Sequence, residues 1–297
     1  MTPPFVLLLA IWGTRYGPSD VNGIVQAAYR LSPGLHSVVL VTDRTRDGID
    51  ARVRQVAFPA DYDRAEFFGR GYRSKLAVFS PQVVPPGLPC VFLDLDTVVI
   101  GDLGRIAALV QGPDDLFMLP PGGLGFGALR RVRDRVKGDG KFPVGNSSIL
   151  AFHADAAPNL AETYASRFGA GDTEATRMVI DDVIIAWFGR GRVKGVPTSC
   201  GVMFRREFLS RVPGWAWFKA WLPGVQRRRS QIAAVTFNGV AVKPEQLATL
   251  AEGDTVSDGR GRSGPWTRRA IGPLWSHLQA TVQPTAASPR PCEDHPG

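Results

Sequence analysis

The sequence predicts an α/β protein with a mostly parallel central sheet flanked by helices. Short, continuous apolar runs at 5–11, 37–41 and 90–93 are typical of parallel strands that are buried on both faces. Between the first two runs, residues 19–31 place apolar side chains at helical spacing. The chain has 297 residues, 44% of them hydrophobic, which is enough to bury a large core.

The first elements form a β-α-β unit with short connections. Strand 5–11 is followed by a helix over 19–31, for which we take Ser19 as the N-cap. The helix ends at Pro33 and Gly34, and the next strand covers 37–41. Such an opening is the start of a doubly wound sheet.

Shorter signals predict the remaining elements and the domain organisation. We predict helices at 72–80, 103–110, 155–168, 174–188 and 265–279, and strands at 90–93, 116–119, 148–152, 193–197 and 232–237. One catalytic domain is expected over 1–280, with a nucleotide-binding half at about 1–110, an acceptor half at about 111–250 and a C-terminal helical segment at about 260–280. Glycine-rich residues 122–127 predict a flexible loop, and proline-rich residues 281–297 predict a disordered tail.

The chain is basic, with a formal net charge of +8 and a pI near 9.8. Much of the excess lies in the stretch 190–229, where Glu207 is the acid that stands among many Arg and Lys residues. The stretch is either a solvated basic face or a face that makes peripheral contact with an anionic membrane. No helix-turn-helix, RNP-like or zinc-finger pattern accompanies the charge, so nucleic acid is not an expected partner.

Cysteine usage indicates the compartment. Cys90, Cys200 and Cys292 are scattered and show neither metal-ligand spacing nor a disulfide framework, which predicts a cytoplasmic protein. Membrane contact through 190–229 would place it at the inner face of the membrane. The apolar run 5–11 is too short to span a bilayer and lacks the basic flank of a signal peptide, so we interpret it as a buried strand.

The strongest chemical signal is the pair Asp94 and Asp96. The apolar strand 90–93 ends in these two acids, and the chain then becomes apolar again. Ligands of open α/β sheets bind beyond the carboxyl ends of strands, which is where both acids fall. Hard oxygen ligands of this kind suit Mg²⁺ or Mn²⁺ bound together with substrate phosphates.

This stretch resembles the D-x-D signature of GT-A glycosyltransferases, especially those of the glycogenin and bacterial galactosyltransferase type. Further stretches are similar to segments of that family and occur in the family's order. They are 12–16 with Asn22, 72–79, 144–152, 181–184 and 237–244. The resemblance therefore covers residues 5–245, and it implies a GT-A fold and a nucleotide-sugar donor.

The resemblance also implies roles for individual residues. Trp12, Gly13, Thr14 and Tyr16 would contact the nucleoside, Lys75 the donor, and Asp94 and Asp96 a Mn²⁺ or Mg²⁺ ion. Asn146, Asp181 and Asp182 would be the catalytic residues that orient the sugar and the acceptor, while Gly239 and Lys243 would grip the diphosphate. The expected donor is a UDP- or GDP-sugar, the acceptor a saccharide or lipid-linked saccharide, and the outcome retention of configuration.

The sequence departs from the family at one metal-binding position, and two other functions stay open. Thr236 stands where the family has a metal-binding His, and the spacing from Gly239 to Lys243 is one residue longer. One alternative is a haloacid-dehalogenase-like, Mg²⁺-dependent phosphatase in which Asp94 is the nucleophile. The other is a catalytically inactive module that binds a nucleotide sugar.

Overall fold

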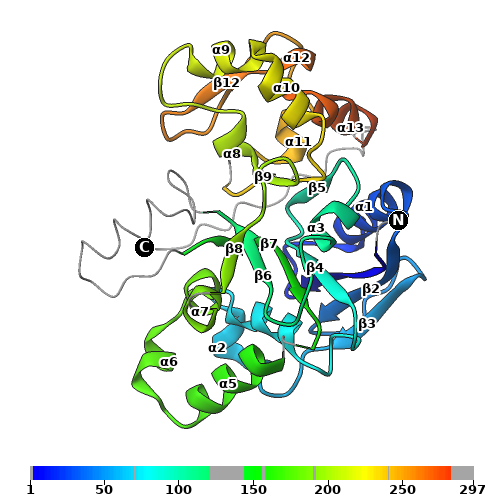
Figure 1. Cartoon of the computed structure of the whole chain (residues 1–297), viewed down its shortest axis with the longest axis vertical. Coiled ribbons are helices and arrows are strands. Elements are labelled where there is room, and N and C mark those ends of the chain that lie inside the picture. The colour runs from blue at the N-terminus through cyan, green and yellow to red at the C-terminus, as the bar shows by residue number, and fades with distance from the viewer. Residues whose placement is uncertain are drawn as a thin grey trace.

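The structure is a computed structural model that describes residues 3–69, 71–120, 144–155, 158–189, 192–239 and 241–281. The glycine-rich run 122–127 and residues 282–297 of the predicted tail lie outside the described residues. The described chain forms a seven-stranded sheet with helices on both faces and a smaller lobe at one end (Figure 1). None of the described helices is long and apolar enough to cross a membrane.

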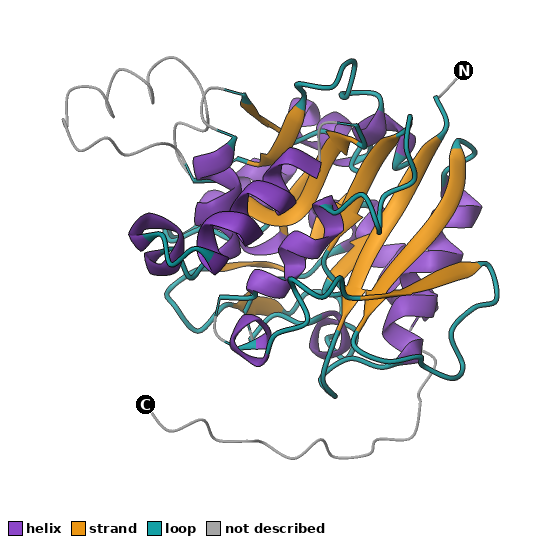
Figure 2. Cartoon of the chain, turned by 90° about the horizontal axis from the view of Figure 1, so that it is seen from below, coloured by secondary structure: helices purple, strands orange, loops and turns teal. Residues whose placement is uncertain are grey.

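The central sheet is mostly parallel, as predicted. Its strands, in spatial order, are β3 (Val53–Ala57), β2 (Leu35–Thr42), β1 (Phe5–Ile11), β4 (Pro89–Leu93), β7 (Asn146–His153), β6 (Leu116–Leu119) and β8 (Val193–Gly195). Strands β3, β2, β1 and β4 run parallel, whereas β7 is antiparallel to both β4 and β6. Figure 2 shows the twisted strands with helices on either side.

Strand β1 shows why apolar and polar residues do not alternate in the apolar runs of the sequence. All seven of its residues are buried, because both faces of the sheet are covered. Val6, Leu8 and Ala10 pack on one face against a group of helices. These are α2 (Ala65–Phe68), the 3-10 helix η1 (Arg73–Phe79), α5 (Pro158–Gly169), α6 (Thr173–Arg177) and α7 (Asp181–Phe188). Phe5, Leu7, Leu9 and Ile11 pack on the other face against α1 (Pro18–Leu31) and α3 (Gly104–Ala107).

The smaller lobe has an aromatic core of its own, which includes Phe204, Phe237 and Trp266. Its helices are α8 (Phe204–Glu207), α9 (Trp215–Trp221), α10 (Pro223–Arg229), α11 (Pro244–Leu247), α12 (Arg268–Ile271) and α13 (Pro273–Thr281). Its strands are β5 (Thr97–Val99), β9 (Gly201–Met203), β10 (Ala234–Thr236), β11 (Thr255–Ser257) and β12 (Ser263–Pro265). Strand β10 lies between β5 and β9, so the residues after Asp96 join the lobe to the main sheet.

Three predicted details are wrong. The helix predicted at 265–279 is broken into α12 and α13, because Gly272 between them has φ +64°, and Pro265 belongs to β12. The N-cap of α1 is Gly17, not Ser19, because Pro18 starts the helix and the Asp20 carboxylate accepts from the Gly17 N–H. The helix predicted at 174–188 is broken into α6 and α7, since the residue before Asp181 is extended and Asp181 N donates to Gly71 O.

Candidate active site

Three backbone hydrogen bonds, one within the turn and two to other segments, hold the turn that carries Asp94 and Asp96. Asp94 directly follows β4, and its N–H donates to the carbonyl of Ser148 in the neighbouring strand β7 at 2.9 Å. Thr97 N donates to Asp94 O at 3.0 Å, and Phe237 N donates to Asp96 O at 2.9 Å. The turn is therefore fixed between the main sheet and the lobe, at the carboxyl end of a central parallel strand.

Both aspartates line a pocket of about 270 Å³ at this edge of the sheet. Of the residues predicted to bind the donor, Trp12, Tyr16, Lys75, Gly239 and Lys243 also line it. The wall is completed by Ala10, Ile11, Arg15, Tyr72, Phe92, Leu95 and Asn238. Strands β1 and β4, the helix η1 and the loop after β10 thus converge on one cavity.

Lys75 is the buried cation of the pocket. Its Nζ lies 2.9 Å from Asp94 Oδ1 and 2.7 Å from Asp181 Oδ2, and it donates to Ser147 Oγ at 3.0 Å. Burial alone would lower the pKa of Lys75, but the Asp181 and Asp94 carboxylates outweigh it and raise the pKa, so the ammonium stays charged. Burial raises the pKa of Asp94 to about 6, against the opposing effect of Lys75.

The first turn of α7 supplies Asp181 and Asp182. The buried Asp181 accepts from Ser147 Oγ at 2.7 Å, while Asp182 Oδ1 accepts from Ser147 N at 2.6 Å and its Oδ2 from Asn146 Nδ2 at 3.4 Å. Burial, with the neighbouring Asp181 charge, raises the pKa of Asp182. Asn146, Asp181 and Asp182 therefore form one network with Lys75. Neither Asn146, Asp181 nor Asp182 lines the pocket itself.

A glycine sets the position of this turn against η1. Gly71 has φ +95°, and a Cβ at this position would lie 1.7 Å from the Val179 carbonyl oxygen. Its own carbonyl accepts from Asp181 N at 3.0 Å. Only glycine allows both the conformation and the close approach, which bring Asp181 within reach of Lys75.

Asp96 faces the lobe side of the pocket. Its Oδ2 accepts from Lys243 Nζ at 2.9 Å, and its Oδ1 accepts from Thr236 Oγ1 at 3.3 Å. Lys243 Nζ also donates to Phe237 O at 2.9 Å, and the single Thr236 hydroxyl proton is shared between Asp96 Oδ1 and Asn238 Oδ1, which lies 3.0 Å from Thr236 Oγ1. Each aspartate therefore has its own lysine, and the two ammonium groups approach the acids from different elements.

Aromatic rings form the wall beside Trp12. The Trp12 and Tyr72 ring centroids are 6.1 Å apart, and both residues line the pocket. Tyr72 is the one described non-glycine residue with positive φ, at 56°, a strained conformation that is concentrated at functional sites. Burial raises the pKa of Tyr16, and the nearby Asp96 charge raises it further. The Tyr16 hydroxyl therefore stays protonated and can donate a hydrogen bond.

Gly13 and Thr14 do not line the pocket. Gly13 has φ +62°; its N–H donates to Asp43 Oδ2 at 3.0 Å and its carbonyl accepts from Arg46 at 2.9 Å. Thr14 is exposed at the tip of the same loop. These contacts shape the loop that carries Trp12 and Tyr16.

Sequence reasoning left Arg15, Tyr72 and Asn238 out of the site. Arg15 and Tyr72 lie within stretches that carry the family resemblance, close to residues that were predicted to bind the donor. Asn238 precedes Gly239 in the closing loop and donates to Ser148 Oγ at 3.2 Å, which ties that loop to β7. A search of those stretches for every polar or aromatic side chain would have found all three.

The oxygen donors around Asp96 suit a divalent cation. Carboxylates, the Thr236 hydroxyl and the Asn238 amide oxygen are hard ligands of the kind that bind Mg²⁺ or Mn²⁺. Within the part of the chain that the structure describes, no group of three or more His, Cys, Asp or Glu side chains could hold a metal ion. A cation here would therefore need phosphate oxygens of the substrate to complete its coordination.

Many cations of the basic stretch 190–229 have carboxylate partners. Arg228 and Arg229 both donate to Glu207, at 2.6 and 2.7 Å, and Arg229 is buried. Lys194 pairs with Asp115, and Arg205 pairs with Asp258 at 2.7 Å. The stretch is therefore not a uniform basic face.

Several solved structures that are similar to this chain are glycosyltransferases. A structure of the galactosyltransferase LgtC, determined with donor and acceptor sugar analogs, aligns with a TM-score of 0.52 over 81% of this chain and 89% of its own, at 12% identity. The bifunctional glycosyltransferase WbbM aligns with a TM-score of 0.52 over 82% of this chain and 47% of its own, also at 12% identity.

This chain has the GT-A glycosyltransferase fold. No family model and no curated protein matches its sequence, so the likeness rests on the structure. The GT-A fold confirms the predicted fold class and the resemblance to the bacterial galactosyltransferase type. It also disfavours the phosphatase alternative, in which Asp94 would be a nucleophile on the first strand, because β4 is preceded here by β1, β2 and β3.

Proposed function

We propose that this protein transfers a sugar from a nucleotide-diphosphate sugar to an acceptor hydroxyl. The observation that carries the proposal is that Asp94 and Asp96, each paired with its own lysine, line one pocket at the carboxyl end of a central GT-A strand. A departing nucleoside diphosphate develops negative charge, and fixed cations in a partly closed pocket stabilise such charge.

The pocket offers a place for each part of the donor. Trp12 and Tyr72 provide flat aromatic surface for a nucleobase, and Tyr16 provides a neutral hydroxyl donor. Lys243 and the Gly239 backbone lie where the diphosphate would bind, next to Asp96. This assignment places the base along β1 and the diphosphate toward the lobe.

Asp94 and Asp96 would hold a Mn²⁺ or Mg²⁺ ion together with the donor phosphates. Such a cation acts as a Lewis acid that offsets charge on the leaving diphosphate. Thr236 and Lys243 contact the two oxygens of the Asp96 carboxylate and so fix its position for such a cation. Lys75 holds Asp94 in the same way from the buried side.

Asn146, Asp181 and Asp182 would orient the transferred sugar and the acceptor. Their network with Lys75 and Ser147 adjoins the donor pocket on the β7 side. The acceptor is a saccharide or lipid-linked saccharide, and retention of anomeric configuration is the expected outcome. Contact of the stretch 190–229 with an anionic membrane stays part of the proposal, and a cytoplasmic location with it.

The test is release of free nucleoside diphosphate from a panel of UDP- and GDP-sugars in the presence of Mn²⁺ or Mg²⁺. We expect at least one donor to be hydrolysed or transferred, with Asp94→Ala and Asp96→Ala both inactive although folded. Thermal stabilisation by a nucleoside diphosphate without turnover of any donor would identify an inactive binding module. Turnover of a generic phosphate ester would instead support the phosphatase.

A further inference from the structure

Helix α9 lies at the outer end of the lobe (Figure 1), and several of its aromatic side chains are exposed. Trp215, Phe218 and Trp221 follow one stripe at intervals of three residues and are 49%, 55% and 62% exposed. On the opposite side of the helix, Ala216 and Ala220 are buried against the lobe. Helix α9 is thus held through its alanines, and its rings point outward.

These exposed rings are clustered in one part of the chain and are not scattered along it. Of the eight large apolar side chains that are exposed among the described residues, five fall within 212–221. We call this patch the α9 surface; its members are Val212, Trp215, Trp217, Phe218 and Trp221. A contiguous patch of this kind on a soluble domain marks an interaction site.

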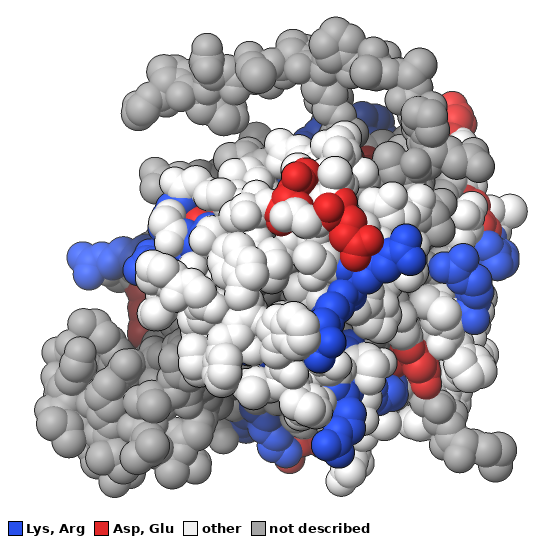
Figure 3. Space-filling view, turned by 90° about the horizontal axis from the view of Figure 1, so that it is seen from above, with Lys and Arg blue, Asp and Glu red and all other residues white. Residues whose placement is uncertain are grey.

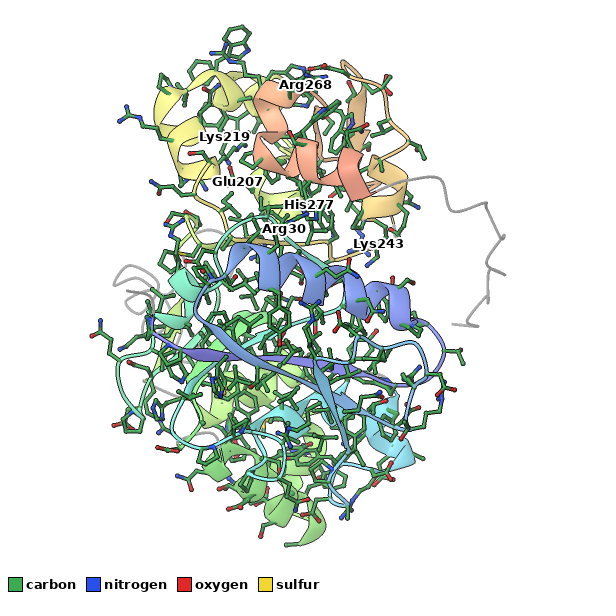
Figure 4. All side chains as sticks on the ribbon, turned by 90° about the vertical axis from the view of Figure 1, so that its right-hand side faces the viewer. Arg30, Glu207, Lys219, Lys243, Arg268 and His277 are labelled. Atoms are coloured by element: carbon green, nitrogen blue, oxygen red, sulfur yellow. The ribbon has the colours of Figure 1, made fainter. Side chains whose placement is uncertain are left out.

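Cations border the α9 surface. The Arg269 guanidinium lies 3.9 Å from the ring centroid of Trp221, and Arg268 lies at the same outer end of the lobe (Figure 4). The view onto this end shows an area without charged side chains, which is bordered by Lys and Arg and also by some Asp and Glu (Figure 3). Glu252, an acid near this end, is paired with Arg268 at 3.4 Å.

A basic cavity of about 370 Å³ opens beside Trp215. Arg206, Arg211, Lys219 and Arg262 line it, together with Glu207, whose carboxylate is already paired with Lys219, Arg228 and Arg229. Burial lowers the pKa of Arg206, and the nearby positive charges of Arg262 and Arg205 lower it further. The cavity therefore favours an anion, and a phosphate group can accept several of these donors at once.

We propose that the α9 surface docks on an anionic phospholipid membrane, with the rings at the headgroup boundary and a lipid phosphate in the cavity beside Trp215. Tryptophan side chains favour the membrane–water boundary, and basic residues next to such a face are attracted to anionic headgroups. A second copy of the chain fits less well, because a twofold contact would bring the same arginines against each other. The membrane contact of the proposed function is thereby assigned to the lobe end.

Co-sedimentation of the full chain with vesicles tests this. We expect binding to vesicles of phosphatidylcholine with phosphatidylglycerol, little binding to phosphatidylcholine alone, and weaker binding as salt is raised. Phe218→Ser/Trp221→Ser should reduce binding about tenfold or more, and Arg211→Gln/Arg262→Gln should remove the preference for the anionic lipid. Val179→Ser/Ile180→Ser, which changes two exposed apolar side chains before α7, is the matched control and should bind as the wild type.

Brominated lipids, added until all of the protein is bound, give a second readout that reports whether the rings lie in the membrane. They should quench tryptophan fluorescence of the wild type more than that of Trp217→Phe/Trp221→Phe. Equal binding by the wild type and Phe218→Ser/Trp221→Ser would overturn the proposal, and so would a dimer that the same substitutions dissociate in the absence of lipid. Donor and acceptor are absent from the assay, so docking can fail while sugar transfer succeeds, and transfer can fail while docking succeeds.

Discussion

Lys243 Nζ lies 2.9 Å from Asp96 Oδ2, although the two residues are 147 positions apart in the chain. The same ammonium donates to the Phe237 carbonyl, so its position is fixed before any ligand binds. We expect Lys243→Met to lower kcat/KM by about 10²–10³-fold, the loss found when one preorganised donor to developing charge is removed. Steady-state kinetics with the active donor measures it.

The control for this variant is Lys194→Met, which removes another paired lysine, from β8, away from the pocket. It should leave kcat/KM unchanged. Because Lys243 is a partly exposed residue at the pocket, Lys243→Met should unfold at nearly the wild-type temperature. A normal kcat/KM for Lys243→Met would remove its assigned role at the diphosphate.

Because Lys75 is buried, we expect its replacement to lower the free energy of unfolding and not only the activity. Replacing it with Met leaves Asp94 and Asp181 without their shared cation. Removing one partner of a buried ion pair costs about 3–5 kcal/mol, and urea unfolding would measure this loss. Lys75→Met/Asp181→Asn should recover part of it, since one of the two stranded charges is gone. If the double variant is no more stable than Lys75→Met, the two groups are not coupled.

The position of Thr236 predicts that metal affinity can be increased. Its hydroxyl lies 3.3 Å from Asp96 Oδ1, so a side chain with a stronger ligand atom there would reach a cation on Asp96. We expect Thr236→His to bind Mn²⁺ at least ~10-fold more tightly, equivalent to ~1.4 kcal/mol. Titration calorimetry with a nucleoside diphosphate present measures the affinity.

Two further variants serve as a control and as an alternative position for the imidazole. Thr236→Val removes the hydroxyl without adding a ligand and should not bind Mn²⁺ more tightly. Thr236 is buried, so the fold of the His variant must be checked by thermal unfolding. Asn238→His places an imidazole on the pocket wall beside it, with more room. No gain in Mn²⁺ affinity in either folded His variant would argue against a cation at Asp96.

The main sheet and the D-x-D turn were predictable because their signals are local. Strand 5–11 matches β1, and the apolar run that ends in Asp94 and Asp96 matches β4 and the turn after it. Lys75 was also found, as part of a contiguous stretch. Its pairing with Asp181 was not, because that contact depends on Gly71 and on a break between α6 and α7.

The lobe was harder to predict, for physical reasons. Helix α9 carries its large aromatic residues on the exposed side and two small alanines on the buried side, so both sides are apolar and no apolar period of 3.6 is visible. Strands β9, β11 and β12 have three residues each, too short for alternation to show. The charges within 190–229 also do not predict the ion pairs of Lys194 with Asp115 and of Arg205 with Asp258, because both acids lie outside this stretch of the sequence.

The junction between the lobe and the main sheet predicts a dependence of stability on pH. His277 of α13 and Arg30 of α1 lie close to each other across this junction (Figure 4). Burial, together with the positive charge of Arg30, lowers the pKa of His277 below its ordinary value. The unfolded chain therefore binds a proton at this position more readily than the folded chain. Stability from this group is present above pH ~6.5 and declines as the pH falls below it.

Urea unfolding between pH 5 and 7.5 tests this relationship, because the free energy of unfolding should rise with pH over this range. His277→Gln cannot titrate, so its profile should be flatter than that of the wild type by the His277 contribution. Arg30→Gln removes the repulsive charge and should raise the pKa of His277 in an NMR titration, which also flattens the profile. Parallel profiles for the wild type and His277→Gln would show that this histidine does not couple protonation to the docking of α13 on α1.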